Sequence, residues 1–133
     1  MKVIIDTSVL IHFHRTHTEE YPRLLQFAKK DEIDLLISSL TIFEYWSGKD
    51  LERKNKLLEA EKLFEPLVII KLDKQIAQKA GEMSRILTSP IQPIDVLIAA
   101  TAFIHHAEIA TYNTKHFKKI PEVKLFDWKR IKK

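Results

Sequence analysis

The chain has 133 residues, of which 45% are hydrophobic and 30% charged, and it contains no cysteine. This composition is typical of an ordinary soluble globular protein, fits a reducing compartment, and excludes a disulfide framework, a cysteine-based zinc site and a thiol nucleophile. The net charge is +4, and the basic excess is C-terminal, because residues 115–133 carry eight Lys or Arg against two acidic residues.

In chain order, short apolar runs alternate with helical patterns. Four runs are predicted to be strands, at residues 2–5, 34–38, 67–70 and 108–111, with residues 123–126 as a candidate fifth. Helices are predicted in the stretches between them, beginning at a cap at Thr7 or Ser8, at Thr18-Glu19-Glu20, at a cap at Ser39 or Thr41, over residues 50–64, at Asp73 and at Pro93.

Strands that alternate with helices predict an α/β fold with a mainly parallel sheet of four to five strands and helices on both faces. No linker or repeat interrupts residues 1–133, so we expect a single domain. In such a sheet, ligands bind beyond the carboxyl ends of the strands. Only two glycines occur, which excludes the glycine-rich phosphate loops. No signal-peptide pattern or membrane-length apolar run is present, so we expect a soluble, cytoplasmic protein.

Three acidic residues stand in apolar surroundings. Asp6 ends the first predicted strand, where a buried carboxylate needs a cation, although capping of the next helix explains it equally well. Glu44 interrupts an apolar string, as the edge of an amphipathic helix also can. Asp95 opens an almost entirely apolar helix, where the helix dipole alone favours an acid. If all three meet at the sheet edge, they repel one another unless a hard cation such as Mg²⁺ or Mn²⁺ neutralises them.

The motifs around these acids occur in a specific order along essentially the whole chain. They are Asp6-Thr7-Ser8-Val9-Leu10, the mid-chain Glu44, Asp95-Val96-Leu97-Ile98-Ala99-Ala100-Thr101-Ala102 and Thr111-Tyr112-Asn113-Thr114-Lys115-His116-Phe117. Together they resemble the PIN domain, and within it most closely the VapC-type toxins of prokaryotic toxin–antitoxin pairs.

The resemblance implies a three-layer αβα sandwich and a Mg²⁺- or Mn²⁺-dependent endoribonuclease whose catalytic, metal-holding acids are Asp6, Glu44 and Asp95. The family's fourth acidic position falls on Asn113, which can orient a water but adds no charge, so we expect one well-held ion. Neighbouring hydroxyl groups are expected to support this site, at Thr7, Ser8 and Thr111. The resemblance also implies an RNA substrate, a homodimer and an antitoxin whose C-terminal segment lies across the active site.

Two alternatives remain open on the sequence. Asn113 favours a catalytically weak or inactive module of the same fold that binds RNA or protein, and a DNA- or structure-specific nuclease has the same motifs. Tyr45 and Trp46 are expected in the core or a dimer interface. Three histidines lack the spacing of a helical metal motif and are expected at the surface, namely His12, His14 and His17. His116 is expected near the cleft, where it can contact phosphate.

Overall fold

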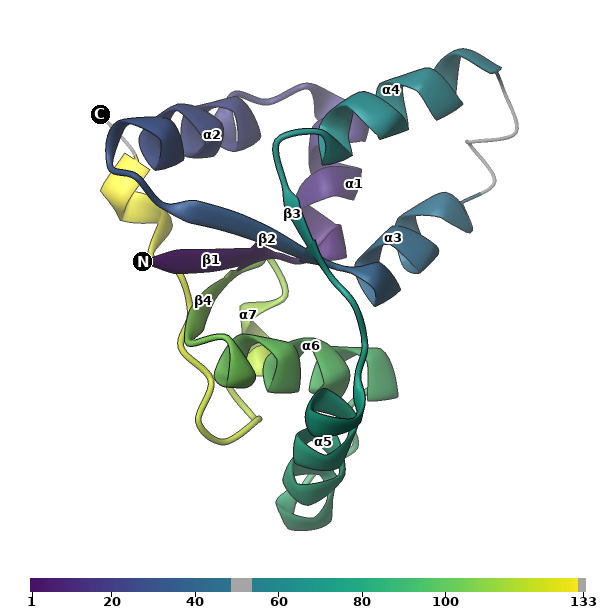
Figure 1. Cartoon of the computed structure of the whole chain (residues 1–133), viewed down its shortest axis with the longest axis vertical. Helices are drawn as coiled ribbons and strands as arrows, with labels where there is room; N and C mark the ends of the chain where they lie inside the picture. The colour runs from purple at the N-terminus through teal and green to yellow at the C-terminus, as the bar shows by residue number, and fades with distance from the viewer. Residues whose placement is uncertain (49–53, 132–133) are drawn as a thin grey trace.

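The computed structural model describes residues 1–48 and 54–131 and contains a parallel sheet between two layers of helices (Figure 1). The strands are β1 (Lys2–Ile5), β2 (Asp34–Ser38), β3 (Val68–Ile70) and β4 (Ala107–Ala110), and their order across the sheet is β3-β2-β1-β4. All pairings are parallel, so the carboxyl ends of the strands meet at one edge. This confirms the predicted α/β architecture, with four strands.

The helices also follow the predicted order. They are α1 (Thr7–Thr16), α2 (Glu20–Lys30), α3 (Ser39–Trp46), α4 (Lys54–Phe64), α5 (Lys74–Ile86), α6 (Pro93–Ile104), α7 (Thr114–Phe117) and the 3-10 helix η2 (Trp128–Ile131). Helices α1 to α4 lie on one side of the sheet, and α5, α6 and α7 lie on the other (Figure 1). Within the described ranges, no helix is long and apolar enough to cross a membrane.

The alternation of side chains along β1 divides the core between the two layers. Val3 and Ile5 pack in the cluster shared with α1 and α2, whereas Ile4 packs in the cluster shared with α5 and α6. All three are fully buried, and burial of each such side chain contributes about 1.5–3 kcal/mol to folding. β1 is therefore a central strand that is buried on both faces, and Asp6 directly follows this buried strand.

The candidate fifth strand is not formed. Leu125 makes only an isolated bridge with Ile109, whose backbone N–H and C=O bond to Lys124 and Phe126. Residues 124–126 therefore bond to β4 at Ile109 alone, and this segment does not continue as a strand along the edge of the sheet. The other strands differ from prediction by at most one residue at an end.

Two of the predicted helix caps were wrong. Thr7 and Ser8 lie inside α1, with Asp6 at its N-cap position, because their hydroxyl groups bond to carboxylates of the site instead. Ser38 caps α3 by accepting from the Leu40 N–H at 3.1 Å, in place of Ser39 or Thr41.

Two other predicted helix starts are confirmed. Asp73 caps α5 by accepting from the Ile76 N–H at 2.8 Å, and Pro93 is the first residue of α6. Of the predicted helix at 50–64, residues 50–53 lie outside the described ranges, and the rest forms α4. Tyr45 is a core residue, 5% exposed, and its hydroxyl lies 2.8 Å from Nδ1 of His14.

Candidate active site

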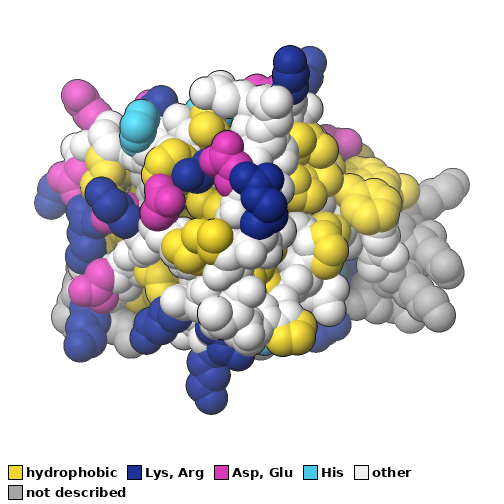
Figure 2. All heavy atoms as spheres, turned by 90° about the horizontal axis from the view of Figure 1, so that it is seen from below, with side chains coloured by type: hydrophobic (Ala, Val, Ile, Leu, Met, Phe, Trp, Pro, Cys, Tyr) yellow, Lys and Arg dark blue, Asp and Glu magenta, His cyan; other side chains and the backbone are white. Residues whose placement is uncertain are grey.

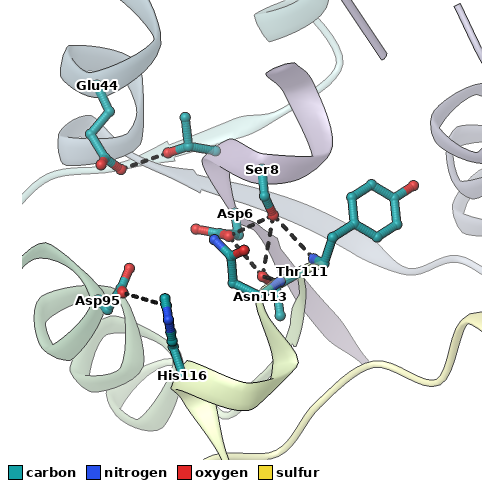
Figure 3. Close-up of polar contacts among 9 residues, drawn as sticks. Asp6, Ser8, Glu44, Asp95, Thr111, Asn113 and His116 are labelled. Carbon is teal, nitrogen blue, oxygen red and sulfur yellow. Dashed lines mark hydrogen bonds and ion pairs between the residues drawn. The ribbon is translucent and has the colours of Figure 1, made fainter. Parts of the chain in front are cut away.

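The carboxyl edge of the sheet brings the four predicted catalytic residues to one pocket. Asp6 follows β1, Glu44 lies on α3 after β2, and Asp95 lies in the first turn of α6. Asn113 lies just beyond the end of β4. These four side chains line a pocket of about 400 Å³, and the three carboxylates extend from three different elements toward a common space (Figure 3).

Hydrogen bonds from hydroxyl groups fix the Asp6 carboxylate. Its Oδ2 accepts from Oγ of Ser8 at 2.8 Å and from Oγ1 of Thr111 at 2.7 Å (Figure 3). Asp6 is 3% exposed and occupies the N-cap position of α1, yet its side chain makes no cap hydrogen bond. The capping explanation for Asp6 is therefore not supported, because its carboxylate is oriented by side chains from two elements.

Ser8 links this carboxylate to the strand on the other side of the site. Its Oγ donates to Asp6 and accepts the backbone N–H of Tyr112 at 3.0 Å. Thr111 in turn accepts the backbone N–H of Asn113 at 2.9 Å. The segment after β4 is thus tied to the end of β1 through two hydroxyl groups, and the supporting roles of both stay predictions.

Glu44 has a separate orienting partner. Oγ1 of Thr7 donates to Oε1 of Glu44 at 2.7 Å, across the interface between α1 and α3 (Figure 3). Thr7 was expected to support the site, and in the structure its hydroxyl contacts Glu44. Because Thr7 is buried and Glu44 is half-buried, this bond holds one carboxylate oxygen and leaves the other available.

Electrostatic repulsion acts on Asp95. Burial raises the pKa of the Asp95 carboxyl above its ordinary value, and the negative charges of Asp6 and Glu44 raise it further. His116 opposes this shift, with Nδ1 at 3.8 Å from Oδ2 of Asp95, but its side chain is 58% exposed. Asp95 thus lies in the field of two other carboxylates, and His116 is the described residue that acts against this shift.

The donors fit a hard divalent cation. All are oxygens, which Mg²⁺ and Mn²⁺ prefer, and a bound cation would relieve the repulsion on Asp95. As they stand, however, no three His, Cys, Asp or Glu side chains in the described ranges form a ready metal cluster. The acids border one pocket, and Thr7 holds one oxygen of Glu44.

The pocket also includes residues that were not predicted. Its wall along α1 is formed by Ile11, His12 and Arg15, and Tyr112 contributes from beyond β4. His12 was expected only at the surface, but its ring contacts Tyr112 edge-on with centroids 5.0 Å apart. Helical spacing from Thr7 and Ser8 is the signal that identifies these residues, because positions four and eight apart lie on one face of a helix.

The hydroxyl support of Asp6 leads to a testable prediction. Thr111→Val keeps the shape of the side chain but removes the donor to Asp6, so RNA cleavage is expected to slow by roughly 10–100-fold. The free energy of unfolding is expected to fall by about 1–3 kcal/mol, because a bond to a charged group is lost. Single-turnover cleavage and urea denaturation measure the two effects. Thr111→Ser retains the hydroxyl, so an equally slow Thr111→Ser variant would contradict this role.

Comparison with known proteins places the whole site within one family model. Residues 3–123 match the model of the PIN domain. Ribonuclease VapC1 of Methanocaldococcus jannaschii is 30% identical over 132 residues, which cover 95% of this chain and 88% of that protein.

Two solved structures share 26% identity with this chain. VapBC2 from Rickettsia felis, bound to a DNA fragment from their promoter, has a TM-score of 0.85, with 96% of this chain and 99% of that chain covered. A toxin–antitoxin complex from Klebsiella pneumoniae has a TM-score of 0.68, with 91% and 94% covered. The range matched by the family model includes Asp6, Glu44, Asp95 and Asn113.

Proposed function

Because this chain belongs to the PIN-domain family, we propose that it is a divalent-metal-dependent endoribonuclease and the toxin of a toxin–antitoxin pair. The observation that carries this proposal is the oriented but electrostatically unbalanced set of Asp6, Glu44 and Asp95 around one pocket. The ribonuclease name of the relative from Methanocaldococcus jannaschii and the toxin–antitoxin complex from Klebsiella pneumoniae support the substrate and the biological role.

In this proposal, Asp6 and Asp95 hold one Mg²⁺ or Mn²⁺ ion, assisted by Glu44. A bound ion of this kind polarises a phosphodiester and lowers the pKa of an attacking water. Ser8 and Thr111 keep the Asp6 carboxylate turned into the pocket, and Thr7 does the same for Glu44. Asn113, exposed at the rim, has an amide that orients the water for in-line attack.

The decisive experiment is metal removal. The purified protein is expected to cut single-stranded RNA with Mg²⁺ or Mn²⁺, to stop completely in EDTA, and to recover little activity with Ca²⁺, whose looser coordination suits in-line transfer poorly. A matched single-stranded DNA tests the DNA-directed alternative. Full RNA cleavage in EDTA would overturn the mechanism, and no cleavage under any metal condition would favour the non-catalytic module that Asn113 makes conceivable.

The proposal extends to two protein partners. We propose a cognate antitoxin, in line with the toxin–antitoxin complex from Klebsiella pneumoniae, and a homodimer, as the family resemblance implies. The described surface carries exposed apolar side chains such as Phe43 and Trp46 on α3, which are available for such contacts. Light scattering at micromolar concentration is expected to give the mass of a dimer, and a monomer mass would count against it.

A further inference from the structure

The pocket extends well beyond the carboxylates. Along α1, Thr7, Ile11 and Arg15 are spaced four residues apart, so they lie in one row on the helix face that lines the pocket. Eight residues at 1.5 Å each place Arg15 about 12 Å along the helix axis from Thr7. The carboxylates, which would hold a single ion, therefore lie at one end of this row, and the end at Arg15 would be free for another part of the substrate.

The charges at the two ends are opposite. Asp6, Glu44 and Asp95 make one end negative, and Arg15 is the sole Lys or Arg among the described residues that line the pocket. Two other arginines have carboxylate partners, Arg23 with Glu19 at 2.6 Å and Arg130 with Glu108 at 3.1 Å. No carboxylate of the described ranges pairs with Arg15, which is exposed. Its planar set of N–H donors is therefore available to a phosphate, whose geometry it matches in a bidentate manner.

Figure 2 shows how basic side chains are distributed on one face of the molecule. On the face shown in Figure 2, Lys and Arg side chains are scattered among acidic and apolar ones, so the described part of that face has no continuous basic patch. Nonspecific attraction of RNA there is correspondingly diffuse. Arg15 instead combines a positive charge with a place inside the pocket that holds the carboxylates.

We propose that Arg15 binds a phosphate of the RNA that neighbours the phosphate being cleaved, and thereby sets the register of the strand in the pocket. This inference rests on the proposed ribonuclease function. Because Arg15 lies about two helical turns from Thr7 along α1, its guanidinium is assigned to binding and the bond-breaking step to the carboxylates. His12, one turn before it on the same wall, is placed to contact the nucleotide between the two phosphates.

Steady-state kinetics with a labelled single-stranded RNA of roughly a dozen nucleotides test this role. Arg15→Gln is expected to raise KM about tenfold, because a hydrogen-bonded charge contact with the RNA is lost. The value of kcat is expected to stay within about twofold of the wild type. The slope of log KM against log salt is expected to fall by roughly 0.7, as for one lost phosphate contact on a single strand. Arg15→Lys, a point charge without the planar fork, should recover part of the effect.

A matched control removes the same charge elsewhere. Lys30 is exposed at the end of α2, just before the start of β2, and therefore lies at the opposite edge of the sheet from the pocket. Lys30→Gln is expected to leave KM and the salt dependence of KM unchanged. Thermal melts of both variants are expected to match the wild type. If Arg15→Gln behaves like Lys30→Gln, or lowers kcat with KM unaltered, the proposal is overturned.

Neutral phosphates locate the contact. Each RNA of a series carries one neutral methylphosphonate at a different position. The wild type is expected to bind weakly when the methylphosphonate lies at one position beside the cleavage site. For Arg15→Gln, a methylphosphonate at that position alone should no longer weaken binding. An unchanged profile would refute the assignment. Fluorescence anisotropy in Ca²⁺ measures the same profile without cleavage. If the wild type binds with this profile but never cleaves, the proposed catalytic function fails while the Arg15 contact stands; if it does not bind RNA, both fail.

Discussion

Asp95→Asn is expected to abolish RNA cleavage in a chain that still folds. The substitution keeps the size of the side chain and its place in the first turn of α6 but removes the negative charge that faces Asp6 across the pocket. Removing a residue that only hydrogen-bonds to a metal ligand lowers activity by about 10–100-fold. Removing the charge of the ligand itself should therefore lower the cleavage rate by more than roughly 10²-fold. Single-turnover cleavage at saturating Mn²⁺ measures this loss, and circular dichroism verifies the fold.

A helix cap elsewhere in the chain provides the matched control. Asp73 caps α5 by accepting from the Ile76 N–H at 2.8 Å, and it does not line the pocket. Asp73→Ala is therefore expected to cost about 1 kcal/mol of stability and to leave cleavage unchanged. If Asp95 is merely a favourable acid at a helix start, Asp95→Ala should behave like Asp73→Ala. An active Asp95→Asn protein would remove the centre of the proposed mechanism.

The positions of the three acids could be predicted because each follows a local signal. The β-branched run before Asp6 marks the end of a buried strand, and Pro93 marks the helix start that places Asp95 in the first turn. Parallel strands then bring those ends to one edge, whatever the details of packing. Local patterns and topology together thus predicted that these carboxylates lie at one edge of the sheet, and the resemblance to the PIN domain predicted their role.

The contacts that orient these acids could not be predicted in the same way. Thr111 lies 105 residues from Asp6, and Thr7 lies 37 residues from Glu44, so no local spacing reveals either bond. The predicted cap of α1 was wrong for a related reason, because the hydroxyl groups of Thr7 and Ser8 bond to the carboxylates of Glu44 and Asp6. Arg15 differs, since helical spacing from Thr7 already places it on the pocket wall.

The stability of the metal-free protein is expected to depend on pH through Asp95. Burial, followed by the charges of Asp6 and Glu44, holds the pKa of Asp95 above its ordinary value in the folded chain, whereas the unfolded chain has the ordinary value. Between these two pKa values the folded protein binds more protons than the unfolded one, so the free energy of unfolding falls as pH rises through this window. The penalty is absent below the ordinary pKa and complete above the raised one.

Asp95→Asn cannot titrate, so in EDTA it is expected to melt at a temperature equal to or higher than the wild type at neutral pH, with a difference that shrinks as pH falls through that window. Mn²⁺ at a hundredfold excess over its Kd should stabilise the wild type by about 2.7 kcal/mol and the variant by much less, because the ion binds the folded state through the removed charge. His116→Gln in both backgrounds corrects for the imidazole that faces Asp95. A simple helix-start role predicts the reverse, a variant less stable by up to about 1 kcal/mol and equally stabilised by Mn²⁺.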